Sequence, residues 1–265
     1  ERRHIVRGED TTTTMGVKAA EIAIKRSGVA KEDIDFVVFA TLSPDYYFPG
    51  PGVLVQRDLG LKTVGALDVR NQCSGFVYAI SVADQYIKTG MYKNILVIGS
   101  EVHSTGLDMS DRGRGVSVIF GDGAGAAVLS REEDLSKGIL STHLHSEGQH
   151  AEELSLVAPG MGNRWVTDII EDNDPNDDSY YPYMNGQFVF KNAVVRFSEV
   201  INEGLQANNL EVSDINMLVP HQANLRISQF IQSKFKLSDD QVYNNIQKYG
   251  NTTAASIPIA LCEAW

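Results

Sequence analysis

Residues 64–99, VGALDVRNQCSGFVYAISVADQYIKTGMYKNILVIG, carry a strand signal, a helix signal and a second strand signal in succession. The apolar runs at 64–69 and 95–99 predict buried strands, because short apolar runs bounded by turn residues are typical of sheet interiors. Between them, residues 74–89 have the apolar spacing of a helix, and Gly90 is a natural stop. This order predicts an α/β fold in which helices cover a sheet.

The same alternation continues in both directions along the chain. Further strands are expected at residues 36–41, 116–120, 124–129, 138–144, 215–219 and 242–246. Further helices are expected at residues 15–27, 53–59, 187–208 and 225–235, with a last one beginning just after Asn251.

The second half of the chain repeats the order of the first. Ile34 and Ile215 open equivalent strands 181 residues apart, and Cys73 and Asn251 each follow a strand at a spacing of 178 residues. This near-constant offset predicts an internal duplication, with one α/β half at 1–136 and a second at 137–265. Strand ends and helix N-termini would then meet in the middle, where α/β proteins usually bind ligands. Because each half lacks elements of the other, we expect a longer protein, truncated here at both ends.

Composition excludes several classes of partner. The net charge of −11 disfavours nucleic acid binding, since phosphates would be repelled. No run approaches the roughly 20 apolar residues of a membrane helix, and no cationic-then-apolar segment suggests secretion. Two cysteines make no disulfide framework. A cytoplasmic protein with no membrane partner is the simplest expectation.

Cys73 is the first candidate for chemistry. It lies on a tight turn between a strand and a helix, where the positive end of the helix dipole lowers a thiol pKa and favours the thiolate. The arrangement resembles a nucleophile elbow with sulfur in place of a hydroxyl. The alternative is a buried small hydrophobe, which a lone cysteine more often is.

His221 and Asn251 are the proposed partners of Cys73. His221 follows Pro220 immediately past a strand, where an imidazole can donate a hydrogen bond or move a proton. The Asn251 amide can donate without ever carrying charge, which suits stabilisation of an enolate. A structural histidine and a helix N-cap asparagine are the alternatives. The duplication, which places Asn251 opposite Cys73, favours the catalytic interpretation.

At these three positions the sequence resembles the β-ketoacyl-acyl-carrier-protein synthase III family of thiolase-like condensing enzymes. The matching segments are CSGFVYAISVADQYIKTG, VIFGDGAGAAVL, STHLHSEG, VPHQANLRI and YGNTTAASIPIAL. The resemblance implies a thiolase-like fold with five layers, α-β-α-β-α, and a catalytic triad of Cys73, His221 and Asn251. It also implies a homodimer that uses coenzyme A thioesters and needs no cofactor or metal.

The family mechanism is ping-pong. An acyl-CoA would acylate Cys73, and malonyl-acyl carrier protein would then lose CO₂ and attack that thioester. His221 and Asn251 would stabilise the enolate, and the Cys73 backbone N–H would form one arm of an oxyanion hole. The family's other arm is a glycine-rich loop that we expect beyond Trp265.

Other family roles carry over to single residues. Arg112 matches an arginine near the CoA adenine, with Arg114 as its rival, and Asn224 matches a residue that contacts the CoA arm. Phe48 matches an aromatic that reaches the partner subunit's acyl pocket. Arg226 matches a position that docks the acidic carrier, and the neighbouring Lys234 and Lys236 are weaker candidates for the same basic patch.

Two departures leave the acyl substrate open. Asn71 and Gln72 precede Cys73 where priming synthases commonly carry small residues, and the segment 168–183 is acidic and aromatic. A longer or aromatic acyl group of specialised metabolism is therefore an alternative. Two further alternatives are acyl transfer without decarboxylation and a silent subunit of a heterodimeric synthase, although silent subunits usually lack the nucleophile.

Three other signals are interpreted as structural. Residues 121–126 (GDGAGA) resemble a dinucleotide-binding loop, but no helix signal follows them. His143 and His145 would share one face of a strand, but no further ligand stands at close spacing, so we expect no metal. Cys262 falls within an apolar helix and is expected in the core.

Overall fold

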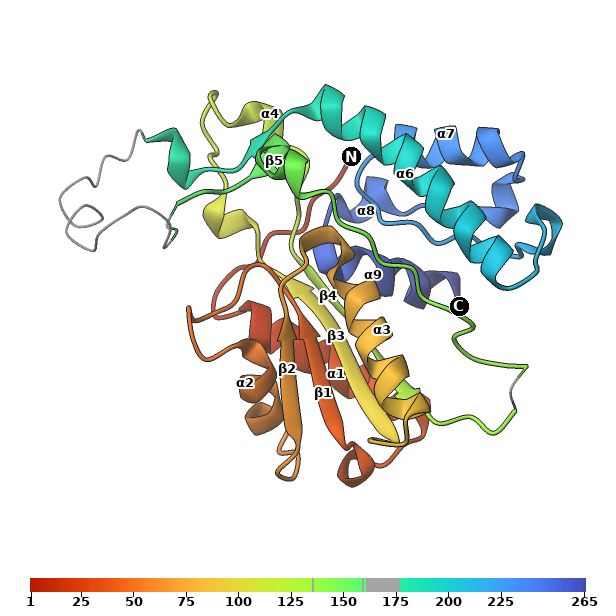
Figure 1. Cartoon of the computed structure of the whole chain (residues 1–265). Coiled ribbons are helices and arrows are strands. Elements are labelled where there is room, and N and C mark those ends of the chain that lie inside the picture. Colours follow the sequence, from red (N-terminus) through yellow and green to blue (C-terminus); the bar gives the residue numbers. More distant parts are fainter. Residues whose placement is uncertain (135, 159, 161–176) are drawn as a thin grey trace.

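The centre of the molecule is a four-stranded sheet of order β2-β1-β3-β4 (Figure 1). The computed structural model describes residues 1–134, 136–158, 160 and 177–265. The strands are β1 (Phe36–Ala40), β2 (Gly65–Val69), β3 (Asn94–Glu101) and β4 (Gly123–Ser130). β1 runs parallel to both β2 and β3, whereas β4 is antiparallel to β3. All four lie where the sequence predicts strands.

Both faces of β1 are buried, which explains its uninterrupted apolar sequence. Val37 and Phe39 belong to the hydrophobic cluster on one face of the sheet, and Val38 and Ala40 belong to the cluster on the other face. β3 is buried along its entire length and alternates in the same way.

Helices α1 (Thr12–Ser27) and α2 (Pro51–Asp58) cover the face towards which Val37 and Phe39 point. α1 starts at a capping box formed by Thr11 and Thr14 and ends at Gly28, whose φ of 73° is left-handed. The expected N-cap threonine and glycine stop are both present in the structure.

The opposite face carries α3 (Gly75–Lys88), a 3₁₀ turn at Thr253–Ala255 and α9 (Ser256–Ala264) (Figure 1). The turn comes very close to β3 at Gly99, where an added Cβ atom would lie 2.4 Å from the Ala254 carbonyl oxygen. Ala254 itself is part of the buried cluster beneath α3. Residues 253–255 therefore pack directly against β3 and against α3, the helix that follows Cys73.

The predicted strands at 215–219 and 242–246 are reduced to a single parallel bridge between Leu218 and Val242. Only two backbone hydrogen bonds support it, Leu218 N–H to Gln241 at 2.7 Å and Tyr243 N–H to Leu218 at 3.0 Å. Among the described residues, the helices of this half are α6 (Gly186–Ala207), α7 (Leu225–Phe235) and α8 (Ile246–Tyr249), in addition to α9. The division of the chain at 136/137 stays a prediction.

Two other strand predictions are wrong. Residues 116–120 include the end of α4 (Arg114–Ser117), because the Ser117 N–H bonds to the Gly113 carbonyl in a helical turn. Residues 138–144 form no strand; there, Lys88 donates to the Ile139 carbonyl, and the Ser81 and Thr142 hydroxyls bond to each other. A two-stranded sheet of β5 (Leu154–Ser155) and β6 (Tyr183–Met184) was not expected.

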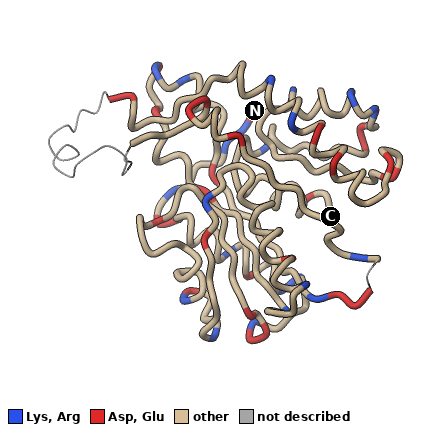
Figure 2. The backbone as a smooth tube through the Cα atoms, in the orientation of Figure 1, with Lys and Arg blue, Asp and Glu red and all other residues tan. Residues whose placement is uncertain are grey.

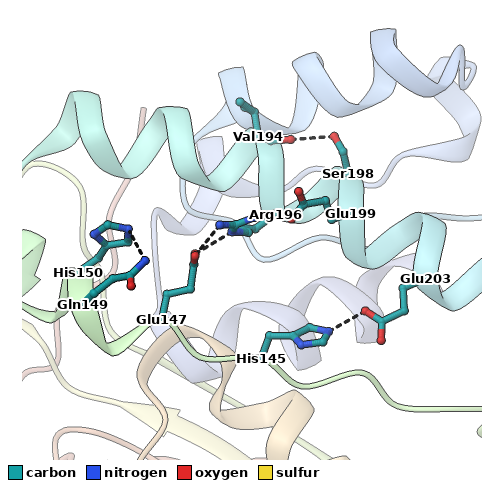
Figure 3. Close-up of polar contacts among 9 residues, drawn as sticks. All are labelled: His145, Glu147, Gln149, His150, Val194, Arg196, Ser198, Glu199 and Glu203. Carbon is teal, nitrogen blue, oxygen red and sulfur yellow. Dashed lines mark hydrogen bonds and ion pairs between the residues drawn. The ribbon is translucent and has the colours of Figure 1, made fainter.

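Ion pairs fasten the segment around residues 143–150 to α6 (Figure 3). Arg196 pairs with Glu147 at 2.5 Å and with Glu199 at 2.6 Å. Glu203 bonds to both His143 and His145, at 3.0 and 2.6 Å. The two histidines singled out in the sequence therefore share one carboxylate on the neighbouring helix.

Charges of both signs are distributed over the periphery of the molecule (Figure 2). Among the helices that the structure describes, none has the length and apolar character needed to cross a bilayer.

Candidate active site

Cys73 lies in a 3₁₀ turn, Gln72–Ser74, between the end of β2 and the start of α3. Gln72 has a φ of 42°, a left-handed conformation that is unfavourable for a residue with a side chain. The Ser74 N–H and hydroxyl both bond to the Asn71 carbonyl, at 3.1 and 2.9 Å, and close the turn. The structure thus has the tight strand-to-helix elbow that the sequence predicts.

The pKa of Cys73 contradicts the sequence expectation. Although the residue as a whole is only half-buried, burial of the sulfur raises the pKa of the thiol to about 12, and the charge of Glu101 adds to the rise. Hydrogen bonds from the Asn251 side chain and the Cys73 backbone oppose that rise. The helix dipole, with about half a charge at its end, does not offset the loss of solvent. Cys73 rests as a neutral thiol.

Backbone pairing fixes Asn251 next to this thiol. Its N–H donates to the Ile119 carbonyl, and its carbonyl accepts from the Gly121 N–H, both at 3.0 Å. The Asn251 Oδ1 atom accepts the Thr253 N–H at 2.8 Å, which leaves Nδ2 as the group directed to Cys73. Asn251 is not the N-cap of α9, because Ala255 holds that position.

His221 is attached to the same C-terminal stretch. Its Nδ1 atom lies 2.5 Å from the Ser256 Oγ atom, and that oxygen also accepts the Gln222 N–H at 3.4 Å. With the Ser256 hydroxyl as the donor to His221 Nδ1, the imidazole carries its own proton on Nε2. Nε2 is buried and has no hydrogen-bond partner among the described residues.

Burial lowers the pKa of His221 to about 4. The imidazole is therefore neutral at physiological pH. A buried donor without a partner costs free energy in the resting protein. Nε2–H is consequently ready for an acceptor that arrives with a ligand.

Sequence reasoning missed Glu101, a fully buried carboxylate at the end of β3. It accepts hydrogen bonds from Thr41 Oγ1 at 2.9 Å, Ser43 Oγ at 2.6 Å and the Leu42 N–H at 3.1 Å. Burial raises its pKa to about 7. The available signal was a charged residue that ends the apolar run of residues 95–99.

His103 was missed as well. Its ring faces Phe120 at 4.9 Å between centroids, and its Nε2 atom bonds to the Thr253 hydroxyl. Burial lowers the pKa of His103 to about 4. Nothing in its local sequence indicates this contact, which joins residues far apart in the chain.

The residues assigned by resemblance to CoA and carrier binding make contacts of their own. Arg112 pairs with Asp108 at 2.5 Å and Asp178 at 3.0 Å, and its guanidinium lies 4.6 Å from the centre of the Tyr181 ring. Arg114 opens α4.

Asn224 caps α7 by accepting the Arg226 N–H at 2.9 Å, and Arg226 is exposed on that helix. Lys234 and Lys236, near the end of α7, are exposed as well. Phe48 is 83% exposed. Of the segment 168–183, residues 168–176 lie outside the described part of the chain.

The discounted signals have structural explanations, with one correction. Residues 121–126 lead into β4 and not into a helix, in agreement with the rejection of a dinucleotide site. Among the described residues, no group of three or more His, Cys, Asp or Glu side chains forms a candidate metal site. The prediction that Cys262 lies in the core is wrong. Cys262 is exposed on α9, and Arg26 donates to its sulfur at 3.0 Å.

Comparison with protein families gives two matches on the chain. Residues 67–148 match the profile of 3-oxoacyl-[acyl-carrier-protein (ACP)] synthase III, and residues 205–265 match the profile of its C-terminal part. Cys73 falls within the first match, and His221 and Asn251 fall within the second.

Individual relatives agree with these matches. The β-ketoacyl-[acyl-carrier-protein] synthase III of Sulfurimonas denitrificans is 43% identical over 98% of this chain and 76% of its own length. The corresponding protein of Aliivibrio fischeri is 46% identical over 99% and 78%. The crystal structure of 3-oxoacyl-[acyl-carrier-protein] synthase III from Aquifex aeolicus matches with a TM-score of 0.87 at 40% identity, over 99% of this chain and 77% of that one.

The structural match confirms the predicted thiolase-like α/β fold class. The sequence match extends over nearly the whole chain, and all three candidate residues lie inside the matched segments. The chain therefore belongs to the 3-oxoacyl-[acyl-carrier-protein] synthase III family.

Proposed function

We propose that this chain is a condensing acyltransferase that forms a β-ketoacyl product from an acyl-CoA and malonyl-acyl carrier protein. The observations that carry the proposal are two uncharged side chains that depend on the same short stretch, residues 251–256. A hydrogen bond from the Asn251 side chain lowers the pKa of the Cys73 thiol, and Ser256 contacts the ring of His221, whose buried Nε2 atom has no partner among the described residues. Such donors suit an intermediate that develops negative charge on oxygen.

In the first half-reaction, the Cys73 sulfur attacks the acyl-CoA carbonyl carbon. The bond from that carbon to the CoA sulfur breaks, and the thiol proton leaves with CoA. Since the pKa of the free thiol is about 12, proton loss accompanies attack and does not precede it. The Cys73 backbone N–H is our candidate donor for the tetrahedral oxyanion.

In the second half-reaction, the malonyl group loses CO₂ and its electron pair forms an enolate. His221 Nε2–H and Asn251 Nδ2–H would donate to the enolate oxygen. The His221 pKa of about 4 supports this role. A neutral imidazole donates a hydrogen bond to the enolate oxygen and does not transfer its proton to the carbanion. The carbanion attacks the acyl thioester, the bond to the Cys73 sulfur breaks, and the thiolate regains a proton.

Acyl transfer without decarboxylation is the second candidate. Condensation is favoured because the two donors, on His221 and Asn251, are uncharged and buried. An enolate needs such donors more than simple acyl transfer does. A silent subunit is disfavoured by the presence of Cys73 in an elbow. Asn71 and Gln72 beside Cys73 leave the choice of acyl group open, with aromatic acyl thioesters included.

The deciding experiment traces the free carboxyl carbon of the malonyl group. The full-length protein is incubated with an acyl-CoA and malonyl-acyl carrier protein labelled in the free carboxyl carbon. We expect labelled CO₂ and one β-ketoacyl thioester per CO₂ released. Acylation of Cys73 without CO₂ release would favour the transfer alternative, and the absence of both would favour the silent subunit.

The assembly and compartment are also proposals. We propose that the protein acts in the cytoplasm. We also propose a homodimer, because the aromatic residues Tyr46, Tyr47 and Phe48 are 53%, 70% and 83% exposed in the single chain. An exposed apolar cluster of this kind marks a protein contact. Arg226 on α7 is the proposed contact for the acidic carrier.

A further inference from the structure

Three of the contacts of His103 lie close to the Asn251 turn. The residue follows β3, and its backbone N–H donates to the buried Asp122 at 2.7 Å. Its ring packs on Phe120, which forms a backbone bridge with Asn251. Its Nε2 atom bonds to the Thr253 hydroxyl, two residues beyond Asn251. Backbone and ring contacts therefore fix where the His103 imidazole lies relative to Thr253.

Thr253 has an unusual conformation for its residue type. It is 1% exposed and has a φ of 50°, a left-handed value that is costly for a β-branched side chain. In this conformation its N–H donates back to the Asn251 Oδ1 atom at 2.8 Å. Such a conformation persists only where surrounding contacts hold it, and the hydroxyl bond to His103 is a direct side-chain contact of this kind.

The orientation of the Asn251 carboxamide depends on this arrangement. With Oδ1 occupied by the Thr253 N–H, only Nδ2 is available to the Cys73 sulfur. A reversed carboxamide would place an oxygen acceptor where the proposed reaction needs a donor. The orientation of the Asn251 carboxamide therefore determines whether this side chain can stabilise an enolate.

We propose that His103 is a positioning residue: through its bond to the Thr253 hydroxyl, it keeps the Asn251 amide group turned towards Cys73. The imidazole touches neither substrate nor Cys73 in this role. Burial keeps it neutral, with a pKa of about 4, so the bond is the same across the working range of pH. The catalytic readout of this proposal rests on the proposed function, whereas its structural readout does not.

Three variants test the link. His103→Leu removes the ring nitrogen and keeps an apolar side chain against Phe120, Thr253→Ala removes the hydroxyl, and the third variant combines both. His150→Leu is the matched control, because the His150 ring also contacts a phenylalanine ring, that of Phe188, with 4.8 Å between the centroids. His103→Gln, which retains a polar group able to reach Thr253, is the conservative variant.

The first measurement is hydrogen exchange of the Thr253 amide. We expect exchange about tenfold faster in His103→Leu and in Thr253→Ala, and an unchanged rate in His150→Leu. The double variant should exchange no faster than Thr253→Ala alone, because both changes remove the same bond. An unchanged Thr253 rate in His103→Leu would overturn the proposal.

The second measurement separates the two half-reactions. We expect CO₂ release from the malonyl thioester to fall about tenfold in His103→Leu, with recovery in His103→Gln, while acylation of Cys73 changes less than about threefold. An equal fall in both half-reactions would reduce His103 to a structural role and contradict the proposal. If the unaltered protein releases no CO₂ at all, the proposed function fails, and amide exchange alone decides the role of His103.

Discussion

The Nδ1 atom of His221 and the Oγ atom of Ser256 lie 2.5 Å apart. Ser256 is the first residue of α9, so the start of this helix determines the direction of the imidazole. A Ser256 hydroxyl that donates to Nδ1 selects the tautomer that carries its proton on Nε2. His221 and Asn251 are thus both positioned by the six residues from Asn251 to Ser256.

Replacement of Ser256 by alanine tests this arrangement. Loss of one hydrogen bond of about 1 kcal/mol, together with free choice of tautomer, should lower CO₂ release about tenfold. Acylation of Cys73 should stay near the unaltered rate, as measured by the mass added to the protein. Ser198→Ala is the control, because Ser198 is a buried helix serine whose hydroxyl donates to the Val194 carbonyl (Figure 3). Equal losses in both variants would contradict a specific role for Ser256.

Cys73→Ala should abolish acyl-enzyme formation from a radiolabelled acyl-CoA. The reason is that the thioester needs the sulfur, and no other group in the turn can replace it. Cys262→Ala, which removes the exposed second cysteine, should label normally. Label retained in Cys73→Ala but lost in Cys262→Ala would reverse the assignment.

Glu101→Gln should make Cys73 more reactive. The negative charge of Glu101 raises the thiol pKa, so its removal lowers that pKa and increases the thiolate fraction at a given pH. The pKa of Glu101 is about 7, and the difference from the unaltered protein should therefore appear above pH 7 and shrink below it. Alkylation rates measured from pH 6 to 9 in a Cys262→Ala background would reveal this.

The control for that experiment is Asp84→Asn. Asp84 is a buried carboxylate that pairs with Lys88 at 2.8 Å. It lies near the C-terminal end of α3, whereas Cys73 precedes the start of that helix. Its loss should leave alkylation unchanged. Slower alkylation in Glu101→Gln than in the unaltered protein would count against the electrostatic explanation.

The buried histidines make stability depend on pH. The folded protein lowers the pKa of His103 from 6.5 to about 4, so only the unfolded chain takes up a proton between those values. Stability contributed by the neutral imidazole is complete above pH 6.5 and is lost as the pH falls towards 4. From pH 7 to pH 5 this loss is about 2 kcal/mol.

His103→Leu should therefore reduce the drop in unfolding free energy between pH 7 and pH 5 by about 2 kcal/mol. Urea unfolding at the two pH values measures the change. His145→Leu is a suitable comparison, because His145 lies on the surface, paired with Glu203. A pH dependence unaltered by His103→Leu would mean that the imidazole is not buried as described.

The sequence predicts the first half of the fold well because its elements are locally encoded. Residues 36–40 are apolar throughout, a run typical of a buried strand or a very short buried helix. The helix behind Cys73 has regular spacing and a clear stop at Gly90. The strand predicted at residues 242–246 is not encoded locally in this way, because it needs a neighbouring strand to pair with. In the structure, its pairing with the 215–219 segment is the single bridge between Leu218 and Val242.

The same distinction separates the site residues. Cys73, His221 and Asn251 stand in short motifs that make them candidates without a structure. The high pKa of Cys73 does not follow from its motif, because it depends on burial beneath the distant turn at Thr253–Ala255 and on the charge of Glu101. The role of His103 likewise depends on a contact with Thr253 that spans 150 residues.

The close approach of Ala254 to Gly99 also bears on the order of events during synthesis. During synthesis, Cys73 and β3 leave the ribosome well before the turn at residues 253–255, which packs on Gly99. Until that turn docks on β3, a nascent chain carries the Cys73 thiol without the Asn251 side chain that bonds to it.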